Sequence, residues 1–223
     1  MDEKKKVLIK NLIPPLKIPS ITTLSLAIEL RRQFKRLKPG ILLDVGSSYS
    51  PYKKYIAYTK YMGLDINKKS QPDICCDLHN IEWQDNYFDT VIATEVLEHL
   101  REPQKAINEI YRVLKPVAIC ILSTRFLFPY HPSPIGAQDA FGDYYRFTSD
   151  SLSHLFKAFS EVEIHSHGNR VQVIWQIINS SGHSRGIFQI IVNAVLNIFT
   201  PLLAQIKFKD TRFPLGFIVY AKK

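Results

Sequence analysis

Cysteine is scarce in this sequence, and its scarcity argues against two kinds of site. Only three cysteines occur among 223 residues, at positions 75, 76 and 120. Because adjacent strand residues point to opposite faces, Cys75 and Cys76 are poor disulfide partners. No Cys-x-x-Cys pair and no spaced Cys/His set is present, so we expect no metal site. The pattern predicts a reducing, cytoplasmic compartment.

Positive and negative side chains are nearly balanced along most of the sequence, and basic residues are in clear excess only near its start. Residues 1–40 hold ten Lys/Arg against three Asp/Glu, whereas the remainder holds nineteen against seventeen. Such a basic arm can contact phosphates or acidic lipid headgroups, although a solvated helix face has the same composition. The first fifteen residues contain no apolar run of signal-peptide length. We expect a basic arm and helix at 1–40 and one domain at 41–223, with an apolar helical insertion at about 170–210.

Apolar periodicity predicts that strands and helices alternate along the chain. Amphipathic helices are expected at 23–37 and 103–115. Two more helices are expected to begin after N-cap residues: one after Thr148, and one after Ser50 with Pro51 in its first position. The expected strands are 41–47, 61–66, 73–78, 88–96, 117–124, 161–167 and 216–223. This alternation is typical of an open parallel sheet with helices on both faces, which binds ligands beyond the carboxyl ends of its strands.

The turn after the first strand reads DVGSSYS and contains one glycine, Gly46. A dinucleotide pyrophosphate needs Gly-x-Gly-x-x-Gly for close backbone approach, so that class is poorly supported. S-adenosylmethionine carries no phosphate. It requires room for a methionine tail and an adenosine, followed by a carboxylate for the ribose hydroxyls. Asp65, at the end of the second strand, suits that carboxylate, and Asp77 suits the adenine amine.

Five segments resemble class I S-adenosylmethionine-dependent methyltransferases of the small-molecule branch: DVGSSYS (44–50), GLDI (63–66), CDLHN (76–80), FDTVIATEVLEHL (88–100) and EIYRVLKPVAICILST (109–124). The resemblance runs from about Ile41 to Phe159. It implies an α/β fold: a Rossmann-like, seven-stranded, mostly parallel sheet with helices on both faces. It also implies S-adenosyl-L-methionine as cofactor, held by Asp44, Gly46, Ser48, Asp65, Ile66, Asp77, Leu78 and Thr94.

Two positions depart from the family pattern. The family turn reads D-x-G-x-G-x-G, and its second and third glycines are Ser48 and Ser50 here. A positive φ at a serine would be strained. The family's Lys-Pro-Gly-Gly is replaced by residues 115–118, Lys-Pro-Val-Ala, in a turn expected away from the cofactor.

By family position, the candidate catalytic residues are Glu95, His99 and His131. A general base must lie within hydrogen-bond reach of an acceptor hydroxyl. Each has a structural alternative: Glu95 can hold a backbone amide, His99 can pack on a helix, and His131 can be exposed. The candidate substrate residues are Tyr144, Tyr145 and Arg146, although the arginine can equally pair with Asp143 or Glu95. The P-Y-H-P and D-Y-Y-R-F-T tracts resemble methyltransferases of polysaccharide and cell-envelope biosynthesis, which implies O-methylation of a small molecule, glycan or lipid-linked intermediate.

Several other functions stay open at this point. A nucleic-acid partner is disfavoured because the Asn/Asp-Pro-Pro-Tyr of base methyltransferases is replaced by residues 93–96, Ala-Thr-Glu-Val; RNA ribose methylation is a weaker alternative. A non-catalytic, methyltransferase-like binding or scaffold protein is another. Residues 187–206 carry no charge. They suit the inner membrane interface, giving a peripheral protein, or a homodimer surface, or the wall of an acceptor pocket.

Overall fold

The computed structural model describes residues 21–132, 142–180, 202 and 212–223. Within these ranges, six strands form one sheet in the order β2-β1-β3-β4-β6-β5. The first four run parallel to one another, and β6 runs antiparallel to both of its neighbours. The strands are β1 (Ile41–Val45), β2 (Lys60–Leu64), β3 (Phe88–Thr94), β4 (Leu114–Arg125), β5 (Glu161–His167) and β6 (Gly216–Lys222).

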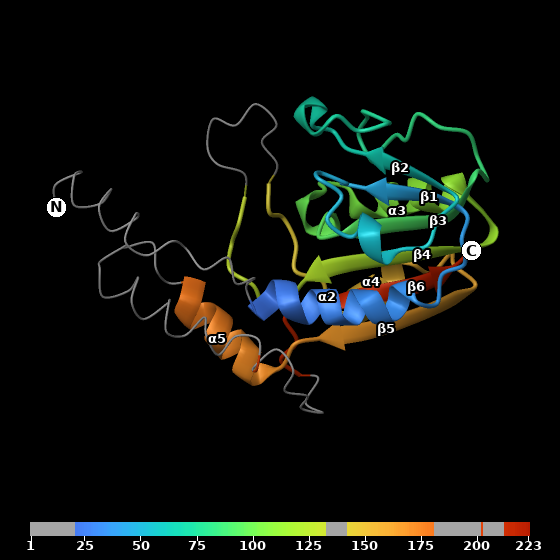
Figure 1. Ribbon diagram of the computed structural model, residues 1–223. Helices are drawn as coiled ribbons and strands as arrows, with labels where there is room; N and C mark the ends of the chain where they lie inside the picture. Colours follow the sequence, from blue (N-terminus) through green and yellow to red (C-terminus); the bar gives the residue numbers. More distant parts are fainter. Residues whose placement is uncertain (1–20, 133–141, 181–201, 203–211) are drawn as a thin grey trace, which may run out of the picture.

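Helices cover both faces of the sheet, as Figure 1 shows. One face packs against α2 (Ile21–Phe34), and the other against α3 (Pro103–Val113) and α4 (Ser149–Leu155). Successive residues of β3 serve opposite faces: Val91 packs in the larger cluster and Ile92 in the cluster under α2. Continuous burial therefore explains why the strands read as unbroken apolar runs. A further helix, α5 (Arg170–Ser180), follows β5. The α/β class and the helices on both faces are confirmed.

Two local predictions are wrong. Residues 73–78 do not form a seventh strand: among the described residues, the chain makes a single bridge to β2, in which Ile74 donates to the Gly63 carbonyl and accepts from Asp65. The alternating burial of Ile74 and Cys76 mimics a strand without a ladder. Likewise, Ser50 caps no α-helix, and a short 3-10 helix at Lys53–Tyr55 takes its place.

The N-cap prediction at Thr148 is confirmed by a reciprocal capping box with Ser151 at the start of α4. Such a cap satisfies helix donors that have no intrahelical partner. Among the described residues, no helix combines the length and the apolar character needed to cross a membrane. Except for Leu202, the uncharged stretch 187–206 lies outside those residues.

Candidate functional site

A pocket of about 920 Å³ opens beyond the carboxyl ends of β1, β2 and β3. Its size falls in the range of small-molecule and cofactor sites. Ten of the predicted site residues line it: eight that were predicted to contact the cofactor or the acceptor, and two candidate catalytic residues that follow β3. These ten are Gly46, Ser48, Asp65, Ile66, Asp77, Leu78, Thr94, Glu95, His99 and Tyr144. The pocket therefore gathers most of the predicted site.

The turn after β1 adopts a left-handed backbone at each position where the family pattern has glycine. The φ angles are 64° at Gly46, 43° at Ser48 and 51° at Ser50. A side chain at position 46 would also collide with Val96, since an added Cβ would lie 2.4 Å from its Cγ2. The two serines thus keep a conformation that glycine adopts without cost, and each stores strain of about 1–3 kcal/mol.

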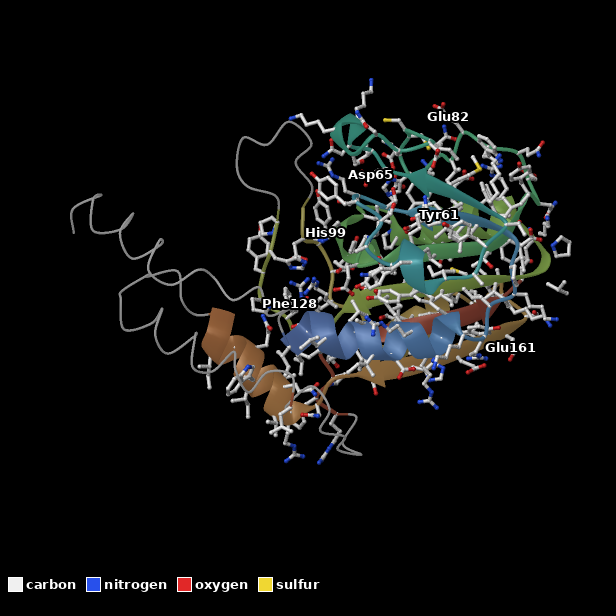
Figure 2. All side chains as sticks on the ribbon, viewed as in Figure 1. Tyr61, Asp65, Glu82, His99, Phe128 and Glu161 are labelled. Atoms are coloured by element: carbon white, nitrogen blue, oxygen red, sulfur yellow. The ribbon has the colours of Figure 1, made fainter. Side chains whose placement is uncertain are left out.

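Asp65 links the turn after β1 to the end of β2. Its Oδ2 accepts from the Ser48 amide at 2.9 Å, and its Oδ1 accepts from the Asn67 amide at 2.8 Å. A carboxylate offers about four acceptor positions, so two backbone amides leave capacity for two further donors. Figure 2 shows Asp65 on the same side of the molecule as His99. Asp65 can therefore accept from two vicinal hydroxyl groups.

Asp77 lies on the next stretch of the pocket wall and is held by His79. Its Oδ1 accepts from the His79 amide at 2.9 Å and lies 2.6 Å from the ring Nδ1. Nδ1 must carry the hydrogen, so Nε2 accepts from the Glu102 amide at the start of α3. Burial raises the pKa of Asp77, but the His79 bonds outweigh it and lower the pKa below its ordinary value. A charged carboxylate is therefore held at the pocket.

Asp44, predicted to contact the cofactor, lies behind the pocket. Its side chain is 2% exposed and accepts from the Tyr61 hydroxyl. Burial raises the pKa of Asp44 to about 7. Its place under the turn fits a role in holding β1 against β2. Its direct contact with cofactor stays a prediction.

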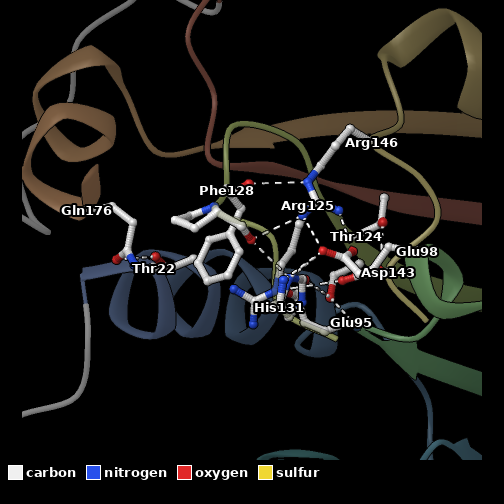
Figure 3. A network of polar contacts seen from close by, with 12 residues as sticks. Thr22, Glu95, Glu98, Thr124, Arg125, Phe128, His131, Asp143, Arg146 and Gln176 are labelled. Atoms are coloured by element: carbon white, nitrogen blue, oxygen red, sulfur yellow. Dashed lines mark hydrogen bonds and ion pairs between the residues drawn. The ribbon is translucent and has the colours of Figure 1, made fainter. Parts of the chain in front are cut away.

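Buried charges gather where β3 and β4 end, as Figure 3 shows. Arg125 Nε lies 2.6 Å from Glu95 Oε2 and 3.6 Å from Glu98 Oε1. The Ser123 hydroxyl donates to Glu95 at 3.1 Å, and the Thr124 hydroxyl donates to Glu98 at 2.8 Å. Glu95 also has a positive φ of 57°, which turns the chain toward this network. One arginine therefore serves two glutamates.

The two glutamates perturb each other. Burial and the neighbouring charge of Glu98 raise the pKa of Glu95, Arg125 opposes both, and the net result is a pKa of about 7. Burial also raises the pKa of Glu98. The nearby His99 has a pKa lowered by burial, so its imidazole is neutral. Side chains in a pocket whose pKa lies near the working pH are suited to proton transfer.

Asp143 and Arg146, in the described part of the loop after β4, pair with each other beside this network. The two form a bidentate pair at 2.5 and 2.6 Å, and Arg146 also donates to the carbonyls of Phe128 and Pro129. Its donors are therefore occupied by the loop. Burial opposes ionisation, yet the Arg146 and His131 contacts lower the pKa of Asp143 to about 2.

The predicted substrate residues lie at different depths. Tyr144 lines the pocket and accepts from Arg101 Nε at 3.0 Å. Tyr145 donates to the Arg101 carbonyl at 3.0 Å, and Arg146 is held by Asp143. Their roles toward a substrate stay predictions, with Tyr144 the best placed.

Sequence reasoning missed three members of the site: His79, Glu98 and Arg125. His79 and Glu98 lie within motifs that resemble the family, but the sequence did not indicate which residues they contact. Arg125 could not be assigned because its contact with Glu98 exists only where the ends of β3 and β4 meet. Asp143 was expected only as a partner of Arg146, and the structure shows that pair.

Comparison with known proteins agrees with this geometry. A family model described as a methyltransferase domain matches residues 43–122. An uncharacterized protein of Methanocaldococcus jannaschii is 31% identical over 93 residues, which make up 39% of this chain and 41% of that protein. The chain thus spans about two fifths of the length of the curated relative it matches.

Solved structures share the fold at low sequence identity. The cyclase SpnF is 20% identical with a TM-score of 0.55, covering 88% of this chain and 81% of that one. Haemonchus contortus phosphoethanolamine N-methyltransferase 2, in complex with S-adenosyl-L-methionine, is 17% identical with a TM-score of 0.54, covering 90% of this chain and 52% of that one. The matched segment contains the turn, Asp65, Asp77 and the β3 end. The chain therefore matches a methyltransferase domain over residues 43–122 and shares its fold with S-adenosylmethionine-dependent methyltransferases.

Proposed function

We propose that this chain binds S-adenosylmethionine in the pocket and transfers its methyl group to an oxygen of a small-molecule, glycan or lipid-linked acceptor. The observation that carries the proposal is the turn at 46–50, with three left-handed residues, joined through the Ser48 amide to the carboxylate of Asp65. A bend of this shape brings backbone close to a ligand, and a carboxylate at the next strand end suits a ribose.

The residues present fit the cofactor. Asp65 retains acceptor capacity for the ribose hydroxyls, and Asp77 is a charged acceptor for the adenine amine. Ile66 and Leu78 follow these carboxylates along the pocket wall and suit the faces of the base. When bound, S-adenosylmethionine supplies an activated methyl group, so the protein must chiefly place the acceptor in line.

The β3 end supplies the groups that can take a proton. The ring Nδ1 of His99 lies 2.6 Å from the Gly142 carbonyl, which can only accept, so the lone pair is on Nε2. Glu95 lines the pocket with a pKa of about 7. A neutral imidazole or a carboxylate of this pKa accepts a hydroxyl proton near neutral pH. We assign the general base to this pair.

Calorimetry with S-adenosylmethionine and S-adenosylhomocysteine tests the proposal. Asp65→Ala should weaken binding roughly 10- to 100-fold, because a charge-assisted hydrogen bond is worth about 1.5–3 kcal/mol. Asp150→Ala, an exposed aspartate in α4, is the matched control and should bind as wild type. Thermal melts establish that each variant is folded. Equal affinity of folded Asp65→Ala and wild type would refute the ribose role.

A binding role without catalysis is the second candidate, favoured by the strained serines at 48 and 50. In a protein that has lost catalysis, the turn is no longer selected for cofactor binding, so serine can replace glycine there despite the strain. The same calorimetry separates the two candidates: folded wild-type protein that binds no cofactor at millimolar concentration supports the scaffold. A lipid-linked acceptor would further place the chain at the inner membrane face, which flotation with anionic liposomes distinguishes from a free glycan.

A further inference from the structure

Three side chains with metal-ligating atoms converge beside the pocket, although the sequence predicted no metal site. They are Glu98, His99 and His131, and one ligand atom of each lies within 4.8 Å of the others. The first two follow β3, and the third belongs to the loop after β4. The imidazole rings of the two histidines are 4.9 Å apart between centroids, edge to face. The fold therefore joins residues more than thirty positions apart into one cluster.

Both histidines are oriented by acceptors on their Nδ1 side. His99 Nδ1 lies 2.6 Å from the Gly142 carbonyl. His131 Nδ1 lies 3.1 Å from Asp143 Oδ2 and 3.1 Å from the Pro129 carbonyl. Because these oxygens only accept, each Nδ1 carries the hydrogen, and the lone pair of each ring is on Nε2. Histidines that bind metals show this pattern, with the second ring nitrogen donating to a carboxylate or backbone carbonyl.

The third side chain, Glu98, has an exposed fraction of 0% and one oxygen without a hydrogen bond. The Thr124 hydroxyl fixes its Oε2, whereas Oε1 has only the ionic contact to Arg125 at 3.6 Å. His131 Nε2 is likewise buried without a hydrogen-bond partner among the described residues. Buried polar atoms normally find partners, so two such atoms in one cluster indicate a missing ligand.

The surrounding charges and donor atoms favour a transition-metal cation. Three carboxylates (Glu95, Glu98 and Asp143) face two guanidinium groups, Arg125 and Arg146, and both imidazoles are neutral acceptors. The donor set of two imidazoles and one carboxylate is typical of first-row transition metals rather than calcium or magnesium, which prefer oxygen alone. Three protein ligands leave a position open, as in catalytic rather than structural sites.

We propose that Glu98, His99 and His131 bind one divalent transition-metal ion, through Glu98 Oε1 and the two Nε2 atoms. Binding draws the ligand atoms together to about 3–3.5 Å, the spacing set by metal–ligand bonds of about 2.1 Å. His99 and Glu95 line the pocket, so the ion borders it. If the proposed function holds, the open position would take the acceptor oxygen and favour its ionised form. Of the pair assigned as general base, Glu95 alone would then accept the proton, because His99 Nε2 is a ligand of the ion.

A cobalt titration of the full chain, treated first with EDTA and then freed of it, tests the site. Co²⁺ bound by nitrogen and oxygen donors absorbs visible light more strongly than the aqueous ion. We expect these bands to saturate at one equivalent of Co²⁺ per chain. His131→Ala and Glu98→Gln should each weaken binding at least about 100-fold, because loss of outer-shell partners alone costs 10- to 100-fold. The glutamine keeps the shape of Glu98 and an oxygen for Thr124, which protects folding.

His154→Ala, an exposed histidine of α4, is the matched control and should bind Co²⁺ as wild type. Absence of Co²⁺ bands in wild type, or equal binding by wild type and folded Glu98→Gln, would overturn the metal site. Calorimetry of S-adenosylmethionine in EDTA keeps the two proposals separate. Co²⁺ binding without cofactor binding would leave the site standing and remove the methyl-transfer role, and the reverse result would remove the site alone.

Discussion

The pocket wall built after β1 and β2 holds its carboxylates differently from the wall built after β3 and β4. On the first wall, Asp65 accepts backbone amides from Ser48 and Asn67. On the second wall, the half-buried Glu95 and the buried Glu98 contact one arginine and two hydroxyl groups. The first wall thus uses short-range backbone donors, and the second uses side chains brought together by the fold.

This difference sets what each wall can tolerate. A carboxylate held by backbone amides needs no charged partner to satisfy its oxygen atoms. Buried carboxylates that share one guanidinium depend on it, because removing one partner of a buried ion pair leaves an uncompensated charge. On the second wall, therefore, the arginine influences the pKa of the carboxyl groups, and its loss would destabilise the fold.

The largest expected effect comes from Arg125→Met, which removes the shared guanidinium while keeping much of its volume. We expect the free energy of unfolding at pH 8 to fall by about 3–5 kcal/mol. The folded-state pKa values of Glu95 and Glu98 are raised, so protonated carboxyls stabilise the fold at low pH and this contribution is lost as pH rises through about 7. The loss should therefore be smaller at pH 5.5. Urea unfolding at both pH values measures it.

Arg32→Ala is the control for that experiment. Its side chain is 76% exposed and lies 3.9 Å from Glu29, a surface pair of a kind worth about 0–1 kcal/mol. A loss in Arg125→Met no larger than in Arg32→Ala, at either pH, would show that the two walls do not differ in this way.

Much of the first wall could be predicted from the sequence because its contacts are local. Gly46 and Asp65 stand at the ends of consecutive strands, so reading the apolar runs also places the ligand residues. On the second wall, Glu95 and His99 were predicted as site residues, but the network that holds them could not be predicted. Glu98 meets Arg125 only through the pairing of β3 with β4, and His131 meets Asp143 only through the return of the following loop. Histidine tautomers and the burial of Glu98 leave no trace in composition or spacing.

The fold was predicted where burial alone decides and was wrong where hydrogen bonding decides. The segment after β2 buries Ile74 and Cys76 in alternation, as a strand would. Yet the Asp73 carboxylate accepts the Gly63 amide at 2.7 Å, and the ladder stops after one bridge. At position 50, a left-handed serine prevented the N-cap geometry that the Ser-Pro pair indicated.

A smaller effect is expected from Asp44→Asn, which tests the buried carboxyl behind the first wall. Burial raises the pKa of Asp44 to about 7 from an ordinary value of 3.8. A raised pKa means that Asp44 favours folding below pH 4 and that this contribution is lost as pH rises toward 7, by up to roughly 1.4 kcal/mol per pH unit. The asparagine variant should lose that part of the slope. Urea unfolding of wild type and variant from pH 4 to pH 8 measures it.

Asp150→Asn, at an exposed position of α4, is the control and should keep the wild-type slope over the same range. Identical pH dependence in Asp44→Asn and wild type would mean that the carboxyl stays ionised beside Tyr61. In that case, the first wall would also hold a buried charged carboxylate. The two walls would then differ only in how many groups contact their carboxylates.

The smallest expected effect comes from relieving strain in the turn with Ser48→Gly. The serine has a φ of 43°, and glycine there avoids a cost of about 1–3 kcal/mol but loses about 0.5–1 kcal/mol of chain entropy. The difference between these two ranges is a net gain of about 0–2.5 kcal/mol, and a gain near the middle, about 1 kcal/mol, raises Tm by roughly 2–4 °C. Val117→Gly is the matched control: Val117 has a φ of 61° and lies in β4 outside the pocket lining. Both variants should melt higher in calorimetric scans, whereas Val117→Gly should leave S-adenosylmethionine affinity unchanged. A gain at position 117 with a loss at position 48 would mean that the Ser48 side chain itself stabilises the first wall.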